Sequence, residues 1–392
     1  MKICSTSHSG ISFRSTGEIS HFAAEWDALL PDNHPLNSRF LRIFEEAALP
    51  DLRFHYLLIS RDDQIIGLAI FQHFHFHSGH YDSKALGQGP MFYLSQLLLC
   101  QETGILVCGN LFHLGQEGFY FPDDSNRSAI FPVALEMEKK YKPGGILLKD
   151  ISEGFSASAL KDSKFRTFSQ DQVMSLSIPP AWNSFDDYIG RLSKKYRQRA
   201  HRVLKLSSPL RLCELNESEL AERREEIGAL YAQVRQRQAL RIGSLNGDYF
   251  LAMKKAHGKK FEVHAWVNEA GQILAFASHI LHPGEEREVH YIGFDYSSNE
   301  EYSLYFNILF DGIRRGITHG NTKILFGRTG FDAKASAGAV PENNLHYFRL
   351  KPGLPALTFK ILSKALAKKE SENWKNRNPF HSAGLKPELE EA

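Results

Sequence analysis

Two cationic residues late in the chain, Arg328 and Lys334, are candidates for binding or catalysis. Both lie in a segment rich in Gly, Ala and Ser that ends at Pro341. Small residues let a ligand approach the backbone closely, and two cations can hold an anion or stabilise an oxyanion. The segment therefore predicts an anion-binding, catalytic loop. Two surface cations in a flexible loop are the alternative.

Residues 287–334 form the unit that would position these cations. Their pattern predicts a strand over 288–295, a helix over 300–319 and a strand over 323–326. A strand–helix–strand unit brings two parallel strands together, with binding groups at the strand ends and at the helix N-terminus. The loop that carries Arg328 is thus expected at a ligand-binding edge of a sheet.

The turn between the first strand and the helix offers further polar groups. Ser298, Asn299 and Ser303 can supply hydroxyls, an amide and backbone N–H groups to a substrate. Glu300 and Glu301 lie in the same first helical turn, where they suit the helix dipole but would repel a phosphate. The sequence therefore predicts only a weak phosphate-binding turn.

A strongly basic stretch precedes this unit. Residues 188–213 contain no acidic residue but eight lysine or arginine residues, namely Arg191, Lys194, Lys195, Arg197, Arg199, Arg202, Lys205 and Arg211. The spacing of the apolar residues predicts a basic helix over 191–206. On a chain with a formal net charge of only +2, this helix is expected to bind an anionic substrate through Lys195, Tyr196 and Arg199. A solvated charged face is the alternative.

An internal similarity between two segments, called the echo below, indicates how the chain is organised. Residues 54–71 and 261–278 both read as an apolar run, a polar turn and a second apolar run that begins with Gln-Ile. Each is typical of a β-hairpin, although hairpins also resemble one another by chance. In each half a further strand, a helix and another strand follow. The pattern predicts an α/β fold (α+β layered) with two domains, 1–180 and 181–366, each a mixed, mostly antiparallel sheet flanked by helices, and a polar tail over 367–392.

Length and composition exclude several classes of protein. A chain of 392 residues is longer than one hydrophobic core usually supports, so two domains are expected. Its 42% apolar and 23% charged residues are typical of a soluble globular protein. The four cysteines form no C-x-x-C pair, which argues against a disulfide framework and a thiolate zinc site. Without a secretory signal or a run long enough to span a membrane, a cytoplasmic protein is expected.

Motifs for other chemistries are missing or weak. The chain has no G-x-S-x-G elbow, no P-loop and no H-E-x-x-H, which argues against hydrolase and kinase readings, and Gly87-Gln88-Gly89 alone is too weak for a dinucleotide loop. Four histidines lie close together at His73, His75, His77 and His80. Two imidazoles on one strand face could hold a transition metal. Because no carboxylate or cysteine follows at ligand spacing beyond Asp82, we expect a polar outer strand face and no metal.

The basic segment, the strand–helix–strand unit and the Arg-Lys loop together resemble the Fem-like branch of the GNAT acyltransferase superfamily. In that branch two GNAT-like halves lie in tandem on one chain. The matching features are a basic segment at 192–197, an FGRS-like turn at 326–329, and a lysine, Lys334, followed by Gly338. The resemblance covers most of residues 20–350.

The resemblance implies an enzyme that transfers an acyl or aminoacyl group from a thioester or ester to an amine. Acyl-CoA is the donor substrate it implies, with aminoacyl-tRNA as the alternative. The implied acceptor is a small-molecule or peptide-like anion that carries the amine. Lys334 matches the family lysine that contacts the anionic acceptor or the developing charge, with Arg328 beside it.

Amine acylation needs an oxyanion site and a proton acceptor. Backbone N–H groups of 291–294 and 323–326 are expected to form the oxyanion site, with Tyr291 and Phe294 against the substrate. Asp295 or His290 would take the proton, directly or through water. A structural role is the alternative for a carboxylate that ends a strand.

Two departures from the family pattern keep other functions open. The pyrophosphate motif of GNAT enzymes is missing before the helix over 300–319, and no pattern for a long helical arm interrupts the second half. An N-acyltransferase is the leading hypothesis. An aminoacyl-tRNA-dependent peptidyltransferase of Fem type would use 191–211 to contact the RNA backbone. A non-catalytic module that binds an anionic ligand is the third hypothesis.

Overall fold

The chain forms two compact units in the computed structural model, which describes residues 2–5, 10–47, 51–75, 80, 104–238, 241, 245–282, 284–351 and 377–380. The first unit comprises Met1–Asp171, Arg237–Leu245 and Asn343–Lys368, and the second comprises Gln172–Gln236, Asn246–Glu342 and Lys369–Ala392. The units therefore are not the linear ranges expected from the sequence, because two later segments belong with the first unit. His77 and most of the expected tail lie outside the described residues.

The sheet of the first unit is mixed and mostly antiparallel. Its strands pair in the order β1–β2–β3–β4–β5–β7–β14, and β6 pairs with β4. Their bounds are β1 (Lys2–Ser5), β2 (Ile11–Thr16), β3 (Leu52–Arg61), β4 (Gln64–Phe74), β5 (Ile105–Cys108), β6 (Phe119–Tyr120), β7 (Gly145–Leu148) and β14 (Val340–Leu350). Only β5 and β7 run parallel among these pairs. The hairpin expected over 54–71 is confirmed as β3–β4.

Helices cover both faces of the first sheet. They are η1 (Ile19–His21), α1 (Ala23–Asp27), α2 (Ser38–Glu46), η3 (Asp124–Ala129), α4 (Ile130–Tyr141) and α5 (Ala157–Ser163). Met137 of α4 packs in one buried cluster with Leu57 of β3. Trp26 of α1 packs with Tyr56, the neighbour of Leu57, in a second cluster. Because adjacent strand residues point to opposite faces, α4 and α1 lie on opposite sides of the sheet.

The second unit repeats this design. Its strands pair in the order β8–β13–β12–β11–β10–β9. Their bounds are β8 (Arg166–Ser177), β9 (Arg211–Glu214), β10 (Phe261–Val267), β11 (Ile273–Leu281), β12 (Glu286–Phe294) and β13 (Lys323–Gly327). The hairpin expected over 261–278 is confirmed as β10–β11. The parallel pair is β12–β13, joined through a helix as expected.

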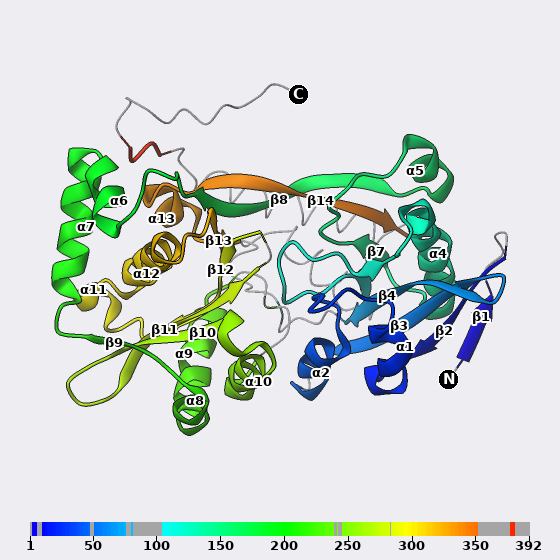
Figure 1. Cartoon of the computed structure of the whole chain (residues 1–392), viewed down its shortest axis with the longest axis horizontal. Coiled ribbons are helices and arrows are strands. Elements are labelled where there is room, and N and C mark those ends of the chain that lie inside the picture. Colours follow the sequence, from blue (N-terminus) through cyan, green and yellow to red (C-terminus); the bar gives the residue numbers. More distant parts are fainter. Residues whose placement is uncertain are drawn as a thin grey trace, which may run out of the picture. The chain divides into compact units, whose positions relative to one another are not determined.

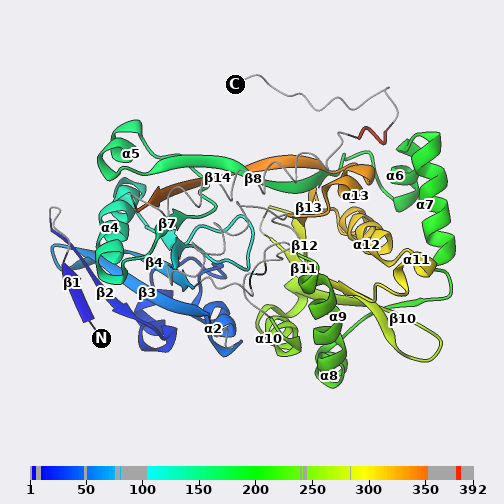
Figure 2. The same ribbon diagram turned by 180° about the vertical axis from the view of Figure 1, so that it is seen from behind.

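The helices of the second unit also lie on both faces of its sheet. They are α6 (Phe185–Arg191), α7 (Lys194–Leu206), α8 (Glu217–Glu222), α9 (Arg224–Gln236), α10 (Gly247–His257), η4 (Gly258–Lys260), α11 (Asn299–Tyr302), α12 (Leu304–Thr318) and α13 (Phe331–Ser336). Ile308 of α12 packs with Ala275 and Ala277, whereas Phe250 of α10 packs edge-on against Phe276. Figures 1 and 2 show α7 and α12 above β9, β10 and β11, and α8 and α10 below these strands.

Two long strands are exchanged between the halves of the sequence. β8 leaves the first unit, and its Ser177 pairs with Lys323 of β13 in the second. β14 leaves the second unit, and its Tyr347 pairs with Leu148 of β7 in the first. Each unit therefore carries the same set: an antiparallel hairpin, a parallel pair connected through a helix, and a final antiparallel strand. This topology confirms the predicted fold class of two similar mixed sheets flanked by helices.

Several local predictions need correction. The helix expected over 300–319 is broken at Ser303, whose φ of 51° lies in the left-handed region. The polar outer face expected for the histidine strand is wrong at His73, which is 6% exposed because both faces of β4 are covered. Burial, with the charges of His75 and Arg53, lowers the pKa of His73 to about 4. Among the described residues, no helix has the length and apolar character needed to cross a membrane.

Candidate active site

The parallel strands of the second unit separate after a short paired stretch. β12 and β13 pair only from Glu286↔Lys323 to Glu288↔Leu325. Beyond that point β12 stays with β11 as far as Phe294, while β13 stays with β8 as far as Gly327. Two strands held by different neighbours leave backbone groups between them that do not pair with each other. The opening between the carboxyl ends of β12 and β13 is the candidate active site.

A bulge in β12 helps to open this gap. Between the pairs Ala277↔Ile292 and His279↔Val289, β12 has one residue more than β11. Ser278 opposes the two bulged residues, and its Oγ both accepts the N–H of Tyr291 and donates to the carbonyl of Tyr291, each at 3.0 Å. A bulge bends its strand and increases the local twist. The Tyr291 N–H, expected from the sequence to line an oxyanion site, is thus bonded to Ser278 instead.

Lys334 lies just past β13, on α13. The residue is 4% exposed, and its Nζ donates to the carbonyl oxygens of Gly327 at 3.1 Å and Arg328 at 2.9 Å. Burial lowers the pKa of Lys334 to about 7. Because the charged form loses its hydration there, the neutral amine is well populated near neutral pH. A buried amine with so large a shift is a candidate for a functional role.

The turn between β13 and α13 owes its shape to two left-handed residues. Thr329 has a φ of 69° and Gly330 a φ of 65°. A Cβ on Gly330 would lie 2.4 Å from the hydroxyl oxygen of Tyr305 on α12. The glycine therefore lets α13 pack directly against α12, which brings Lys334 under the end of β13. Here a neighbouring tyrosine, rather than a ligand, makes the close approach.

Arg328 acts on Tyr291 electrostatically, so the two sides of the opening interact. Burial raises the pKa of Tyr291, and the charges of Tyr231 and Glu288 add to this rise, whereas the positive charge of Arg328 opposes it. Tyr291 belongs to β12 and Arg328 follows β13. The structure therefore brings together Tyr291, Arg328 and Lys334 from the sites expected on the sequence.

His290, expected as a base, is the centre of a buried chain of hydrogen bonds. Its Nε2 lies 2.7 Å from the hydroxyl of Tyr249, and its Nδ1 lies 2.7 Å from Glu288 Oε1. The other oxygen of Glu288 lies 2.7 Å from Nε2 of His282, whose side chain is 21% exposed. A carboxylate at Nδ1 leaves Nε2 to accept the Tyr249 proton. The chain thus connects an inner hydroxyl with an imidazole near the surface.

The charges along this chain are set by Glu288. Burial alone would raise the pKa of Glu288, but His290 and His282 lower it well below its ordinary value. Burial alone would lower the pKa of His282, but the hydrogen bond and charge of Glu288 raise it. An ionised carboxylate between two imidazoles is the arrangement that orients a histidine and stabilises its protonated form. Tyr249 and Glu288 were not among the residues singled out from the sequence.

Polar groups of the turn after β12 form hydrogen bonds with one another. The Asp295 carboxylate accepts hydrogen bonds from the hydroxyls and backbone N–H groups of Ser297 and Ser298. Burial alone would raise the pKa of Asp295, but these bonds lower it. Asn299 Oδ1 accepts the N–H of Tyr305, and Ser303 joins α11 to α12. Asp295 is therefore a stabilised carboxylate that organises the turn, which is a poor state for a base.

The predicted basic helix exists as α7 and packs against α12. Lys195 and Arg199 are exposed, and the Arg199 guanidinium lies 4.3 Å from the centre of the Phe306 ring on α12. Tyr196 is half-buried, with Lys195 Nζ 5.9 Å from its ring centre. The cations thus form an outer face beside α12. Phe294, by contrast, is only 4% exposed and belongs to the core under that helix.

The first unit has no equivalent opening among its described residues. Its parallel strands pair along the whole of β5, up to Cys108↔Leu148. The following residue, Lys149, is buried, donates to the His113 carbonyl at 2.7 Å and forms an ion pair with Asp150. A filled, charge-paired position replaces the gap, so the second unit carries the candidate site.

Several solved structures are similar to this chain. FemX matches at 11% identity and a TM-score of 0.49, over 89% of this chain and 99% of FemX. A tandem GNAT protein from the clavulanic acid biosynthesis pathway matches at 10% identity and a TM-score of 0.44, over 88% of this chain and 99% of its own. L-PGS from Bacillus licheniformis matches at 12% identity and a TM-score of 0.46, over 84% and 95%. No protein-family model and no curated protein matches the chain. FemX and the tandem GNAT protein bear the names of the groups that the sequence resembles. Because these three TM-scores are below 0.5, the similarities add no argument about the site, which is described from its own geometry.

Proposed function

We propose that the protein is an N-acyltransferase that moves an acyl group from a thioester or ester donor to an amine on an anionic acceptor. The single observation that carries the proposal is the separation of β12 from β13 beside Arg328 and Lys334. A gap between two strands accepts an extended, amide-like donor, because both walls offer backbone donors and acceptors. The positive charge of Arg328 at its end suits an acceptor that carries a negative charge.

Residues of the chain would have separate roles in the acyl transfer. Arg328 binds the acceptor anion and holds the amine against the donor carbonyl. Lys334 fixes the carbonyl groups of Gly327 and Arg328, which positions the arginine. The attacking amine loses its proton to the Tyr249 hydroxyl as that hydroxyl passes its own proton to His290. Glu288 stabilises the imidazolium so formed. As the tetrahedral intermediate collapses, the leaving thiol or alcohol takes the proton back from His290 through Tyr249.

The donor is proposed to be acyl-CoA. The exposed cations of α7 lie beside α12 and can attract the phosphates of such a donor. The same cations would suit the backbone of an aminoacyl-tRNA, which is the second candidate. Phosphates in RNA release more counterions than a single CoA does, so only transfer from tRNA would weaken steeply as salt is added.

The test is the variant Arg328→Gln, assayed with acyl-CoA and with aminoacyl-tRNA donors on amines that carry a carboxylate or phosphate. We expect kcat/KM to fall by about 100-fold, the scale of losing one charge-stabilising donor. Arg224→Gln is the matched control, since Arg224 is an exposed arginine of the same unit, on α9. Equal rates for both variants would remove Arg328 from the site. Ligand binding without transfer from either donor would favour the non-catalytic module.

A further inference from the structure

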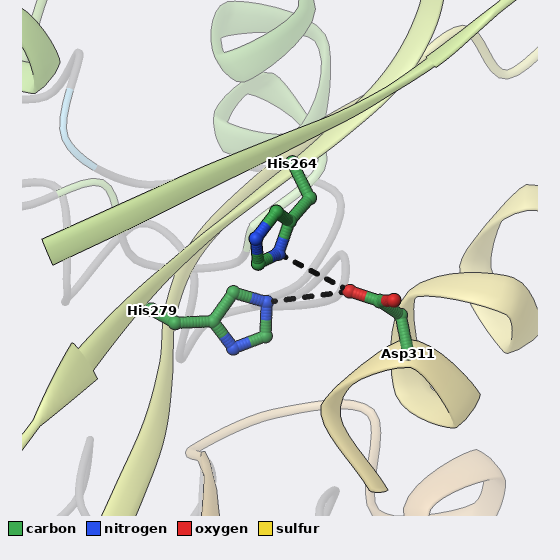
Figure 3. Close-up of side chains that lie close together, drawn as sticks. All are labelled: His264, His279 and Asp311. Carbon is green, nitrogen blue, oxygen red and sulfur yellow. Dashed lines mark ion pairs between the residues drawn. The ribbon is translucent and has the colours of Figure 1, made fainter. Parts of the chain in front are cut away.

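Two buried histidines and an aspartate of the second unit converge on one point. His264 lies on β10, His279 on β11 and Asp311 on α12. Both histidines have no exposed surface, and Asp311 is 3% exposed. Figure 3 shows the two rings and the carboxylate directed toward one another from the two strands and the helix.

The imidazoles of this cluster lack hydrogen-bond partners. Among the described residues, neither ring nitrogen of His264 and neither ring nitrogen of His279 takes part in a hydrogen bond. Buried polar groups are nearly always satisfied, so four unsatisfied nitrogens in one place require an explanation. The Asp311 carboxylate is close enough to attract both imidazoles, but neither histidine forms a hydrogen bond with it.

The spacing of the three groups fits a metal ion. His264 Nδ1 lies 3.3 Å and His279 Nε2 lies 3.8 Å from Asp311 Oδ2, and the three ligand atoms all lie within 4.8 Å of one another. Ligands about 2.0–2.1 Å from a tetrahedral zinc ion lie about 3.3 Å apart. We propose that His264, His279 and Asp311 bind a divalent transition-metal ion of the zinc class.

Neighbouring side chains would hold the ligands in place. Arg315 Nε donates to Asp311 Oδ2 at 2.9 Å, which fixes the carboxylate and leaves it a free lone pair. Glu262 Oε2 lies 3.5 Å from Nε2 of His264, the ring nitrogen that faces away from Asp311, and Arg287 holds that glutamate at 2.8 Å. A carboxylate behind a coordinating histidine is a common support in metal sites.

A pocket reaches the cluster at Asp311, although neither histidine lines it. It has a volume of about 330 Å³ and lies between α7, β10 and α12. Asp311 is one of its lining residues, together with Trp266 of β10 and Ser207 at the end of α7. The cluster is thus buried but not sealed.

A similar group in the first unit contains a histidine whose two ring nitrogens are both satisfied. His346 lies near Asp150 and Asp171. Its Nδ1 accepts the backbone N–H of Asp150 at 2.8 Å, and its Nε2 lies 3.0 Å from Asp171 Oδ2. Both nitrogens of His346 are used, so that histidine needs no ion. The contrast assigns the metal site to the second unit.

The test uses the full chain, stripped with a chelator and titrated with Zn²⁺ against a chromophoric competitor. Asp311→Asn keeps the shape and can still accept the Arg315 bond, whereas it removes the ligand charge. We expect its zinc affinity to fall by about 100-fold or more at one equivalent. Asp248→Asn is the control, because Asp248 is an exposed carboxylate of the same unit with a side chain that is 68% exposed. The control should bind zinc as the wild type does.

A second measurement distinguishes binding at this cluster from binding elsewhere on the chain. Co²⁺ in a four-coordinate site gives visible absorption bands that an ion on surface groups does not give. We expect these bands in the wild type and in Asp248→Asn, and their loss in Asp311→Asn. Near-ultraviolet circular dichroism checks that each variant is folded. No uptake by the wild type, or equal affinity and equal bands in Asp311→Asn, would overturn the proposal.

Discussion

Lys334 shows how burial turns an ordinary side chain into a reactive one. Its amine donates to two backbone carbonyl groups, and among the described residues no carboxylate pairs with its charge. A buried lysine without a counter-charge gives up its proton easily. The residue type and position were predictable from the sequence, whereas the degree of burial was not, because α13 and Tyr305 create it.

The stability of the protein should therefore depend on pH through Lys334. Its folded pKa of about 7 lies below the ordinary 10.5, so the unfolded chain binds more protons between these values. The free energy of unfolding should rise as pH increases through that window, by about 2 kcal/mol from about pH 7 to about pH 9. Denaturant unfolding of the wild type and of Lys334→Met measures the difference. Parallel curves for the two proteins would show that Lys334 is charged when folded.

Other residues of the site were harder to read from the sequence. Arg328 and Tyr291 lie where the strand–helix–strand pattern indicated, because strand ends determine their place. Asp295 was expected as one of two possible bases, and nothing in the pattern shows that Ser297 and Ser298 bond to it. Tyr249 was missed because it comes 41 residues before its partner His290 and on a separate helix.

At the level of elements, helix α9 sets how β12 is held. Gly293 of β12 has no side chain, and a Cβ there would lie 2.6 Å from backbone atoms of both Leu230 and Tyr231 on α9. The helix backbone thus rests directly on the strand that forms one wall of the site. The sequence predicted the strand, although it did not predict the bulge at Ser278, since bulges depend on partner register.

Gly293→Ala should separate these elements. The added methyl group meets the rigid backbone of α9 as well as the buried Phe276 ring, so we expect a loss of about 2 kcal/mol in stability and a lower kcat. Gly190→Ala is the matched control, because no atom lies within 4 Å of a Cβ at that helical position. Thermal unfolding of both variants measures the effect. A melting temperature for Gly293→Ala equal to that of the control would show that α9 yields without cost.

At the level of the whole chain, the exchange of β8 and β14 was beyond the sequence pattern. The echo predicted two similar halves, and the strand sets confirm this. Pattern and periodicity describe local segments, but they do not say which sheet a final strand joins. The expected division near residue 180 placed each half's last strand in its own domain, whereas β14 pairs with β7.

The exchange predicts that the first half does not fold alone. A fragment of residues 1–171 leaves the edge of β7 from Gly145 to Leu148 without the partner that β14 supplies. An unpaired, apolar edge strand favours aggregation. We expect this fragment to be insoluble or partly unfolded, and to recover when co-expressed with residues 172–392. A soluble fragment with cooperative unfolding would show that β14 is dispensable.

The same exchange affects synthesis on the ribosome. The first sheet begins within the opening residues, yet its last strand ends at Leu350. During translation β7 stays without its partner β14 until about 190 further residues have been made, which takes roughly ten to forty seconds at ordinary elongation rates. Nascent chains of this protein therefore depend more than most on chaperones that shield an unfinished edge.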